Sequence, residues 1–210
     1  MSGLILMGGG GHCRSAIDVI EAEGNHHILG VLEHPAFEDD DVLGYPILGG
    51  DDALADLVGH GVGVLVTIGQ IKTSKIRARA FAAAKKAGAL LPVIVSPNAY
   101  CSRRADIGAG TLVMHGAVVN AACRVGENCI VNSMALLEHD VSIGDHTHIA
   151  TGARVNGGVK IGARCFIGSG AILHNDIEID EGAIIPAGSV VRSSVPTCLS
   201  SPEQRGVAHG

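Results

Sequence analysis

A branched aliphatic residue recurs at every sixth position from Ile107 to Val191 without a shift of register. The positions are Ile107, Val113, Val119, Val125, Val131, Leu137, Ile143, Ile149, Val155, Ile161, Ile167, Leu173, Ile179, Ile185 and Val191. Four places after each, the residue is usually small, and glycine often follows the aliphatic, where we expect it to supply turn conformations. Period six does not match the 3.6-residue turn of an α-helix. It predicts short strands joined by turns, with three hexads closing a coil of about 18 residues around stacked aliphatic side chains.

The first half of the chain alternates short apolar runs with segments typical of helices. The predicted strands cover residues 4–7, 28–33, 62–68 and 90–95, and the predicted helices cover 15–23, 51–59 and 72–87. Ser15 is expected to cap the first helix and Gly24 to end it. Strands that alternate with helices indicate a parallel sheet. We therefore predict an α/β, Rossmann-like domain at 1–96 and an all-β, parallel β-helix domain at 97–210, with the boundary near Pro97.

Composition narrows the possible partners. The 210 residues carry a net charge of −6 and no Lys/Arg-rich run, which argues against nucleic acid and anionic membranes. No apolar stretch approaches the roughly 18 residues of a membrane span, and Met1–Met7 lacks the features of a signal peptide. We therefore expect a cytoplasmic protein with reduced cysteines. The six cysteines include no C-x-x-C pair, so no structural zinc site is expected.

A glycine loop follows the first predicted strand and ends at His12, at the start of a helix. Such a turn is where backbone N–H groups commonly meet phosphate. Glu33 follows at the end of the next predicted strand, as in the dinucleotide-binding fingerprint, but Arg14 stands where that fingerprint has glycine. The unit also has no room for a dehydrogenase substrate domain. A nucleotide-linked small molecule is the favoured ligand, with a redox cofactor and a ligand-free turn as alternatives.

A neutral imidazole such as that of His139 accepts protons well near neutral pH, as a general base must. A carboxylate on the other ring nitrogen would fix its tautomer. Asp140 reaches the ring only if the backbone turns there, because strand neighbours point to opposite faces, and Glu138 is the alternative partner. His146 and His148 form a His-x-His pair, but no carboxylate or cysteine completes a metal site with them and His139, so no metal is expected.

Thr151, Ser169 and Ala187 are spaced by eighteen residues, which stacks them in one column on the outside of the coils. Small side chains there would leave backbone amides open to a long, thin ligand along the axis. His139 falls on a different face, so the two would meet at a corner or between chains. Asn132 is a further candidate for contact with an acceptor. Coil faces rich in aliphatic residues would not all stay in water, and we expect a homotrimer.

The hexads, the loop ending at His12 and the segment Leu137–Asp140 together resemble the bacterial hexapeptide-repeat nucleotide-sugar N-acetyltransferases, which make 4-acetamido sugars such as diacetylbacillosamine and N-acetylperosamine. The sialic-acid-pathway O-acetyltransferases share this architecture. The resemblance implies a left-handed β-helix that transfers an acetyl group from acetyl-CoA. It implies as acceptor the amine of a nucleotide-linked 4-amino-4,6-dideoxy sugar, held by the N-terminal domain, which attacks acetyl-CoA directly without an acyl-enzyme.

The resemblance also implies roles for single residues. His139 matches the general base and Asp140 its acidic neighbour. His148 matches a residue near the acetyl-CoA thioester, where we expect it to donate to the thioester oxygen, and Ser169 and Ala187 match positions that meet the rest of CoA. The positions that match the nucleotide-sugar site are Gly10, Gly11, His12, Glu33 and Gly69.

Two departures from the family pattern bear on these roles. Glu33 is followed by His34, where relatives often carry a second acidic residue, and the tail from Val195 to Cys198 replaces a Gly-x-Pro-Ala loop. A sugar O-acetyltransferase of the sialic-acid type is one alternative. A non-acetyltransferase β-helix protein of the carbonic-anhydrase type is another, and it requires a three-histidine metal site. The choice between UDP and GDP, and between amine and hydroxyl, stays open.

Overall fold

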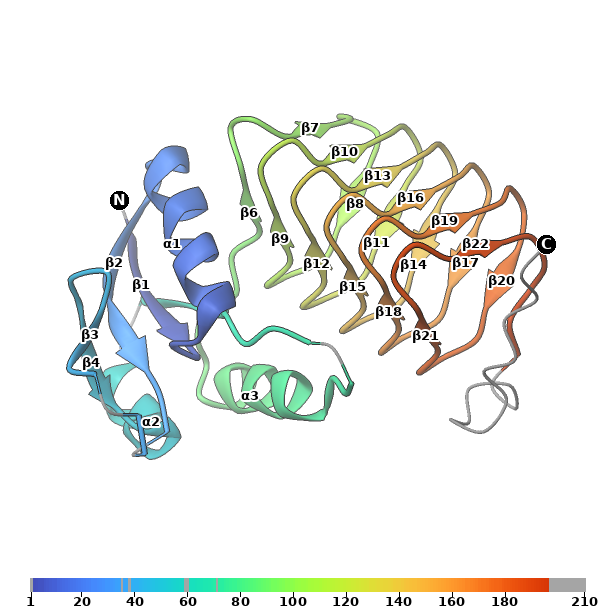
Figure 1. Cartoon of the computed structure of the whole chain (residues 1–210). Coiled ribbons are helices and arrows are strands. Elements are labelled where there is room, and N and C mark those ends of the chain that lie inside the picture. Colours follow the sequence, from blue (N-terminus) through green and yellow to red (C-terminus); the bar gives the residue numbers. More distant parts are fainter. Residues whose placement is uncertain (1, 35, 38, 59–60, 71, 197–210) are drawn as a thin grey trace.

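The computed structural model describes residues 2–34, 36–37, 39–58, 61–70 and 72–196 (Figure 1). An N-terminal α/β unit is followed by a left-handed parallel β-helix, as the sequence predicts. The strands of the α/β unit are β1 (Ser2–Met7), β2 (His26–Leu32), β3 (Asp41–Val42), β4 (Tyr45–Gly49) and β5 (Gly63–Val66). They form one sheet in the order β3-β4-β2-β1-β5, in which β4, β2, β1 and β5 are parallel. The hairpin of β3 and β4 was not predicted; Asp41 closes its turn by accepting from the amide of Gly44 at 2.9 Å.

The helices of this unit differ from their predicted bounds. Helix α1 (Gly11–Glu23) begins four residues before Ser15, with Gly10 at its N-cap, and ends as predicted at Gly24, which is left-handed at φ 72°. The helix expected at 51–59 is a 3₁₀ turn, η1 (Asp51–Ala53), followed by α2 (Leu54–Leu57), and its last predicted residue lies outside the described residues. Helix α3 (Lys75–Lys86) matches the third prediction over most of its length.

The β-helix is built from two-residue strands at the predicted period. They are β6 (Ile94–Val95), β7 (Tyr100–Cys101), β8 (Asp106–Ile107), β9 (Leu112–Val113), β10 (Val118–Val119), β11 (Arg124–Val125), β12 (Ile130–Val131), β13 (Leu136–Leu137), β14 (Ser142–Ile143), β15 (His148–Ile149), β16 (Arg154–Val155), β17 (Lys160–Ile161), β18 (Phe166–Ile167), β19 (Ile172–Leu173), β20 (Glu178–Ile179), β21 (Ile184–Ile185) and β22 (Val190–Val191). Every third strand belongs to one sheet, and we call the three sheets I (β6 to β21), II (β7 to β22) and III (β8 to β20). The predicted strand at 90–95 is therefore split, because β6 pairs with β9 in sheet I and Leu90 alone bridges the N-terminal sheet.

The interior of the coils confirms the hexad prediction. The second residue of each strand from β9 to β21 is buried in one cluster, together with most of the residues that follow four places later. The glycines after the aliphatics have another role than the one expected. Gly108, Gly126, Gly144 and Gly162 do not adopt a positive φ, and a β-carbon at Gly108, Gly144 or Gly162 would lie 2.5 Å from the backbone of the next coil. They permit the coils to approach closely.

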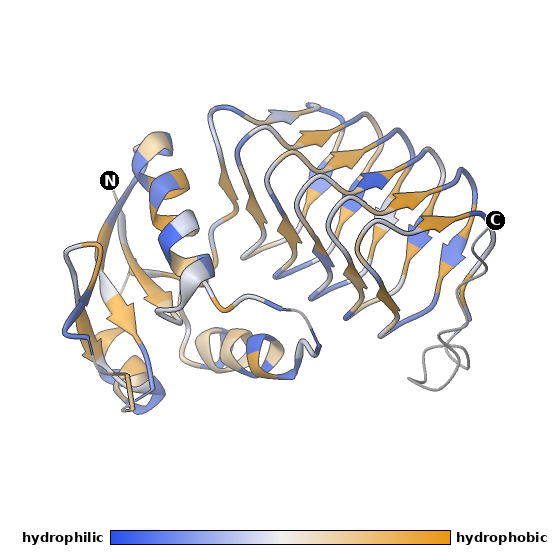
Figure 2. Cartoon of the chain, in the orientation of Figure 1, coloured by the Kyte–Doolittle hydropathy of each residue, from blue (hydrophilic) through white to orange (hydrophobic). Residues whose placement is uncertain are grey.

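The outward residues give the three sheets different surfaces (Figure 2). Sheet III presents polar and charged side chains such as Arg124, Lys160 and Glu178. Sheet I presents apolar ones except for His148 of β15, and its first strands are buried against α1 through Ile94 and Leu112. Sheet II presents a tyrosine and then an aliphatic strip that one arginine interrupts, and no helix or strand of the described chain lies over it (Figure 1). Its outward residues are Tyr100, Val118, Leu136, Arg154, Ile172 and Val190.

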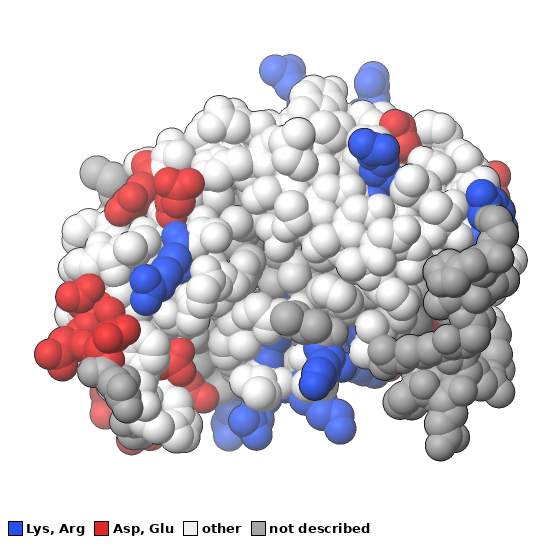
Figure 3. All heavy atoms as spheres, in the orientation of Figure 1, with Lys and Arg blue, Asp and Glu red and all other residues white. Residues whose placement is uncertain are grey.

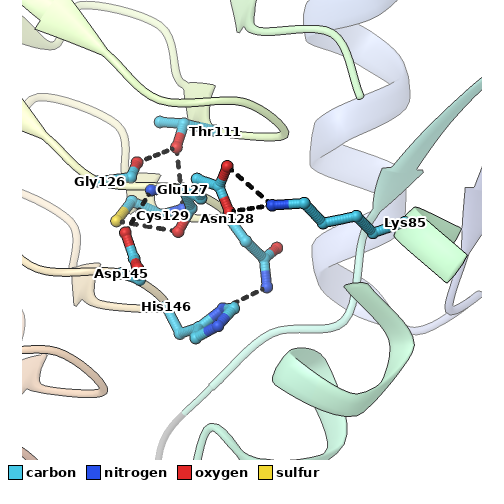
Figure 4. Close-up of polar contacts among 8 residues, drawn as sticks. All are labelled: Lys85, Thr111, Gly126, Glu127, Asn128, Cys129, Asp145 and His146. Carbon is cyan, nitrogen blue, oxygen red and sulfur yellow. Dashed lines mark hydrogen bonds and ion pairs between the residues drawn. The ribbon is translucent and has the colours of Figure 1, made fainter. Parts of the chain in front are cut away.

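Polar contacts hold the α/β unit against the coils at the two corners that flank sheet I. From α3, the buried Arg77 donates to the backbone oxygen of Asn128 at 2.6 Å. Lys85 of the same helix forms an ion pair with Glu127 at 3.0 Å (Figure 4). At the other corner, the imidazole of His115 bridges Asp18 of α1, at 2.8 Å, and Ser96, at 2.6 Å. The relative position of unit and coils is therefore fixed by contacts on two sides.

Candidate active site

A cavity of about 1020 Å³ lies between the α/β unit and the coils. Its walls come from the carboxyl ends of β1, β2 and β5, from η1 and α3, and from two coil residues. They are Gly8, Gly10, Gly11, His12, Leu32, Glu33, His34, Gly50, Asp51, Asp52, Thr67, Ile68, Gly69, Gln70, Ile76, Arg79, Asn132 and His148. The carboxyl edge of a parallel sheet is where such folds bind ligands. All five predicted nucleotide-sugar positions line this cavity.

The glycine loop forms the wall of the cavity at the N-terminus of α1. A β-carbon at Gly10 or Gly11 would meet no atom within 4 Å, and neither residue has a positive φ. These two glycines are therefore not required by the protein's own packing, and their bare α-carbons face free space. Thr67 anchors the loop by donating to the backbone oxygen of Gly8 at 2.7 Å. The helix end supplies N–H groups and a partial positive charge to whatever occupies the cavity.

The carboxylate of Glu33 is already engaged within the protein. One oxygen accepts from the amide of Gly9 and the other accepts from the amide of His34 at 2.7 Å. Glu33 thus ties the end of β2 to the glycine loop. A contact with a ribose or base, as predicted, would use the lone pairs that these bonds leave.

Two histidines, the half-buried His12 and the buried His148, stand side by side at the inner end of the cavity. The ring centroids of His12 and His148 are 6.2 Å apart. Burial, with a smaller contribution from the nearby Arg77, lowers the pKa of His12 to about 4 and that of His148 to about 3. Both rings are therefore neutral near pH 7. The Nε2 of His12 is buried without a hydrogen-bond partner among the described residues.

The tautomer of His148 follows from its neighbours. Nδ1 lies 3.0 Å from the backbone oxygen of Gln70, which can only accept, so Nδ1 carries the proton. Nε2 then accepts from the amide of Asn132 at 3.0 Å. His148 therefore has no free N–H, and the expectation that it donates to the thioester oxygen disagrees with this hydrogen-bond pattern. Its contact with CoA stays a prediction.

His139 lies at the corner between sheets II and III, with 64% of its side chain exposed. Its Nδ1 is 2.8 Å from the carboxylate of Asp140. Asp140 reaches the ring because its backbone turns into the left-handed region, with φ 61°. Glu138 instead accepts from Asn120 at 3.0 Å, which decides between the two candidate partners in this structure. The hydrogen bond from Asp140 raises the pKa of His139.

The candidate base His139 and the cavity are on different sides of one chain. Asn132 lies at the corner between sheets I and II, and His148 lies on sheet I, whereas His139 lies at the next corner. His146 lies at the third corner, where it accepts from Asn128 at 2.9 Å. Within the described residues, no group of three or more His, Cys, Asp or Glu side chains is placed to hold a metal ion.

The predicted CoA column stacks as expected, although it follows a corner and not a flat face. Thr151, Ser169 and Ala187 are exposed in successive coils between sheets I and II. The amide of Gly170 donates to the oxygen of Thr151 at 2.9 Å, and that of Gly188 donates to Ser169 at 2.8 Å. These two amides thus bind the neighbouring coil and are not open to a ligand.

Gln70 is a site residue that sequence reasoning missed. Its side-chain amide donates to the backbone oxygen of Cys165 at 3.1 Å, while its own backbone oxygen holds His148. Ile76 and Arg79 of α3 also line the cavity without having been predicted. No motif marks any of the three, because their roles arise from the packing of α3 and the preceding loop against the coils.

The described helices include none that is both long enough and apolar enough to cross a bilayer.

Comparisons with known proteins agree with this architecture. Residues 3–81 match the model of the PglD N-terminal domain, and residues 158–193 match the bacterial transferase hexapeptide model. No curated protein sequence matches the chain.

Several solved structures are similar over nearly the whole chain. The acetyltransferase domain of PglB from Neisseria gonorrhoeae, in complex with acetyl coenzyme A, is 29% identical with a TM-score of 0.87, covering 93% of each chain. PerB from Caulobacter crescentus, in complex with CoA and GDP-perosamine, is 30% identical with a TM-score of 0.85, covering 93% of this chain and 91% of that one. WeeI from Acinetobacter baumannii, at 20% identity and a TM-score of 0.71 over 90% of this chain and 96% of that one, shares the fold. The chain therefore belongs to the hexapeptide-repeat, left-handed β-helix nucleotide-sugar N-acetyltransferases, in the group of PglD and perosamine N-acetyltransferase.

Proposed function

We propose that the protein transfers the acetyl group of acetyl-CoA to the amine of a nucleotide-linked 4-amino-4,6-dideoxy sugar. The observation that carries this proposal is the cavity at the N-terminus of α1, which has an open glycine loop at one wall and coil residues at another. The relatives solved with acetyl coenzyme A, and with CoA and GDP-perosamine, support both substrates. The pyrophosphate of the acceptor suits the amides of Gly10 and Gly11 at the helix end.

The chemistry needs one base. His139 removes a proton from the sugar ammonium or from the attacking amine, with Asp140 holding Nδ1 so that Nε2 faces the substrate. The amine nitrogen forms a bond to the thioester carbon, and the carbon–sulfur bond breaks. The proton held by His139 then passes to the departing CoA thiolate. No acyl-enzyme forms in this scheme, and no metal takes part in it.

A second copy of the chain would complete the site. The aliphatic strip of sheet II is uncovered, and an apolar surface of this kind favours association. Three copies packed with sheet II toward a three-fold axis would bring the corner of His139 in one copy against the corner of Asn132 in the next. The base of one copy would then meet the acceptor cavity of another. Acetyl-CoA would lie along the same groove, beside Ser169 and Ala187.

Replacing Gly11 by leucine is expected to block acceptor binding. Leucine suits the first turn of α1, and its side chain would extend into the cavity. We expect the KM for the nucleotide sugar to rise about tenfold or more, which corresponds to at least ~1.4 kcal/mol, with the affinity for acetyl-CoA unchanged. Steady-state kinetics measure the first and calorimetry the second. Ser15→Leu, on the same helix but outside the cavity, is the matched control and should behave as wild type.

Replacing Ala187 by tryptophan is expected to weaken acetyl-CoA binding. Ala187 is exposed, so the larger side chain should not disturb the coils. It would obstruct the groove along which CoA is proposed to lie, and the Kd for acetyl-CoA should rise about tenfold or more. Calorimetry of this variant and of Arg124→Trp, on sheet III, makes the comparison. Equal affinities in the two variants would mean that CoA does not use this column.

An acceptor panel tests the proposed function. Thiol release from acetyl-CoA is followed with UDP- and GDP-linked 4-amino-4,6-dideoxy sugars and with the matching 4-hydroxy sugars. We expect release with an amino sugar only, and a product whose acetyl group resists mild alkali, as an amide does. An alkali-labile product on a hydroxyl sugar would instead identify an O-acetyltransferase.

A further inference from the structure

The imidazole of His139 lies against a glycine of the next coil. The amide of Gly158 donates to the backbone oxygen of His139 at 3.0 Å, which stacks the pair Gly157–Gly158 directly over His139 and Asp140. A β-carbon at Gly157 would lie 2.6 Å from Cε1, 2.7 Å from Nε2 and 3.2 Å from Nδ1 of His139. These are the three atoms nearest to it. The ring therefore occupies the space that a side chain at position 157 would take.

The backbone conformation does not explain why residue 157 is a glycine. Gly158 is left-handed, with φ 73°, and a side chain there would also meet the carboxylate of Asp176, so Gly158 has conformational and steric reasons of its own. Gly157 is not among the residues of positive φ. Alanine is thus compatible with its conformation, and the three atoms nearest to the alanine β-carbon would all belong to the imidazole.

We propose that Gly157 is a positioning residue, whose bare α-carbon is the surface against which the His139 imidazole is held beside Asp140. This inference rests on the proposed role of His139 as the base. The ring needs such a support because most of it is exposed and Nε2 has no partner in the described part of the chain. An exposed side chain otherwise samples several rotamers, and a misplaced base loses much of its effect.

Gly157→Ala tests the proposal in the full-length protein. We expect kcat to fall at least tenfold, toward the hundredfold that a displacement of about 1 Å can cost, with both KM values and the melting temperature unchanged. NMR titrations follow the pKa of His139, whose signal is assigned by its loss in His139→Ala. In the wild type this pKa should lie above 6.5, because Asp140 raises it. Glu138 and Asp176 also face the ring and raise the pKa. In Gly157→Ala, the loss of the Asp140 contact should move it down toward 6.5.

A double-mutant cycle separates positioning from other effects. Once His139 is alanine, adding Gly157→Ala should not change the residual rate, since no imidazole remains to be displaced. An equal fall in both backgrounds, or wild-type kcat in the single variant, would overturn the role of Gly157 while leaving His139 as the base. Full activity of His139→Ala itself would instead overturn the proposed role of His139 as the base, on which this inference rests.

Discussion

Alanine at position 139 should lower kcat by about 10²–10⁴, the usual contribution of a general base, while the Kd for acetyl-CoA and the KM for the sugar stay near wild type. The side chain is exposed and contacts Asp140, so its removal should not destabilise the coils. Steady-state kinetics and calorimetry measure the two effects. His27→Ala, at an exposed histidine of β2, is the control and should retain wild-type turnover. More than a tenth of wild-type turnover in His139→Ala would exclude His139 as the base.

Asp140→Asn gives a milder form of the same test. The base works unprotonated, so activity rises with pH through the pKa of His139. Because Asp140 raises this pKa, the asparagine variant should show its acid limb at lower pH than the wild type. The pH dependence of kcat/KM reports this directly. An unshifted limb would show that Asp140 does not tune the base.

Acid should lower the free energy of unfolding through two histidines that lie between the α/β unit and the coils. Burial holds the pKa of His148 at about 3 in the folded protein, against about 6.5 in the unfolded chain. Between these values the unfolded state binds more protons, so the free energy of unfolding falls as pH drops from 6.5 toward 3. The loss for His148 alone is up to about 5 kcal/mol. His12, with a pKa of about 4, adds to it in the same direction.

Urea unfolding at several pH values between 7 and 4 measures this loss. His148→Gln removes the titrating group, so its stability should be lower at pH 7 but should fall less steeply on acidification. His27→Gln, whose histidine is exposed, should keep the wild-type slope. Parallel slopes for the wild type and His148→Gln would mean that His148 is not buried as a neutral ring.

The coils could be predicted from the sequence because their structure is periodic. One aliphatic position every six residues determines both the strands and the interior, and each coil packs only on its neighbours. The hairpin at Asp41–Gly49 could not be found in this way. Its first strand, β3, has two residues, follows an acidic run, and pairs only with β4, which itself lies at the edge of β2. The early start of α1 was missed because its N-cap is Gly10, which has no side chain that could cap the helix and mark its start in the sequence.

The candidate site likewise has features that are local in the sequence and could be predicted, and contacts that arise only from tertiary packing. The glycine loop and the His139–Asp140 pair are local in sequence, and the structure places them as a cavity wall and a hydrogen-bonded pair. The choice of Asp140 over Glu138 depends on a left-handed backbone, which the sequence does not mark. The partners of His148 were out of reach, because Gln70 is 78 residues away along the chain and meets it only through tertiary packing.

Two inactive variants combined in one trimer test most directly whether the base of one copy serves the cavity of another. His139→Ala and Gly11→Leu chains carry different affinity tags, are produced together, and are purified through both tags in succession; light scattering confirms the trimer. If the site is shared between neighbours, every mixed trimer has one site with an intact base and an intact cavity, and should show roughly a third of the wild-type rate at an acceptor concentration near the wild-type KM, well below the raised KM of Gly11→Leu. Both parent trimers should stay nearly inactive at acceptor concentrations below the raised KM. Mixed trimers as inactive as their parents would contradict a site built from two chains.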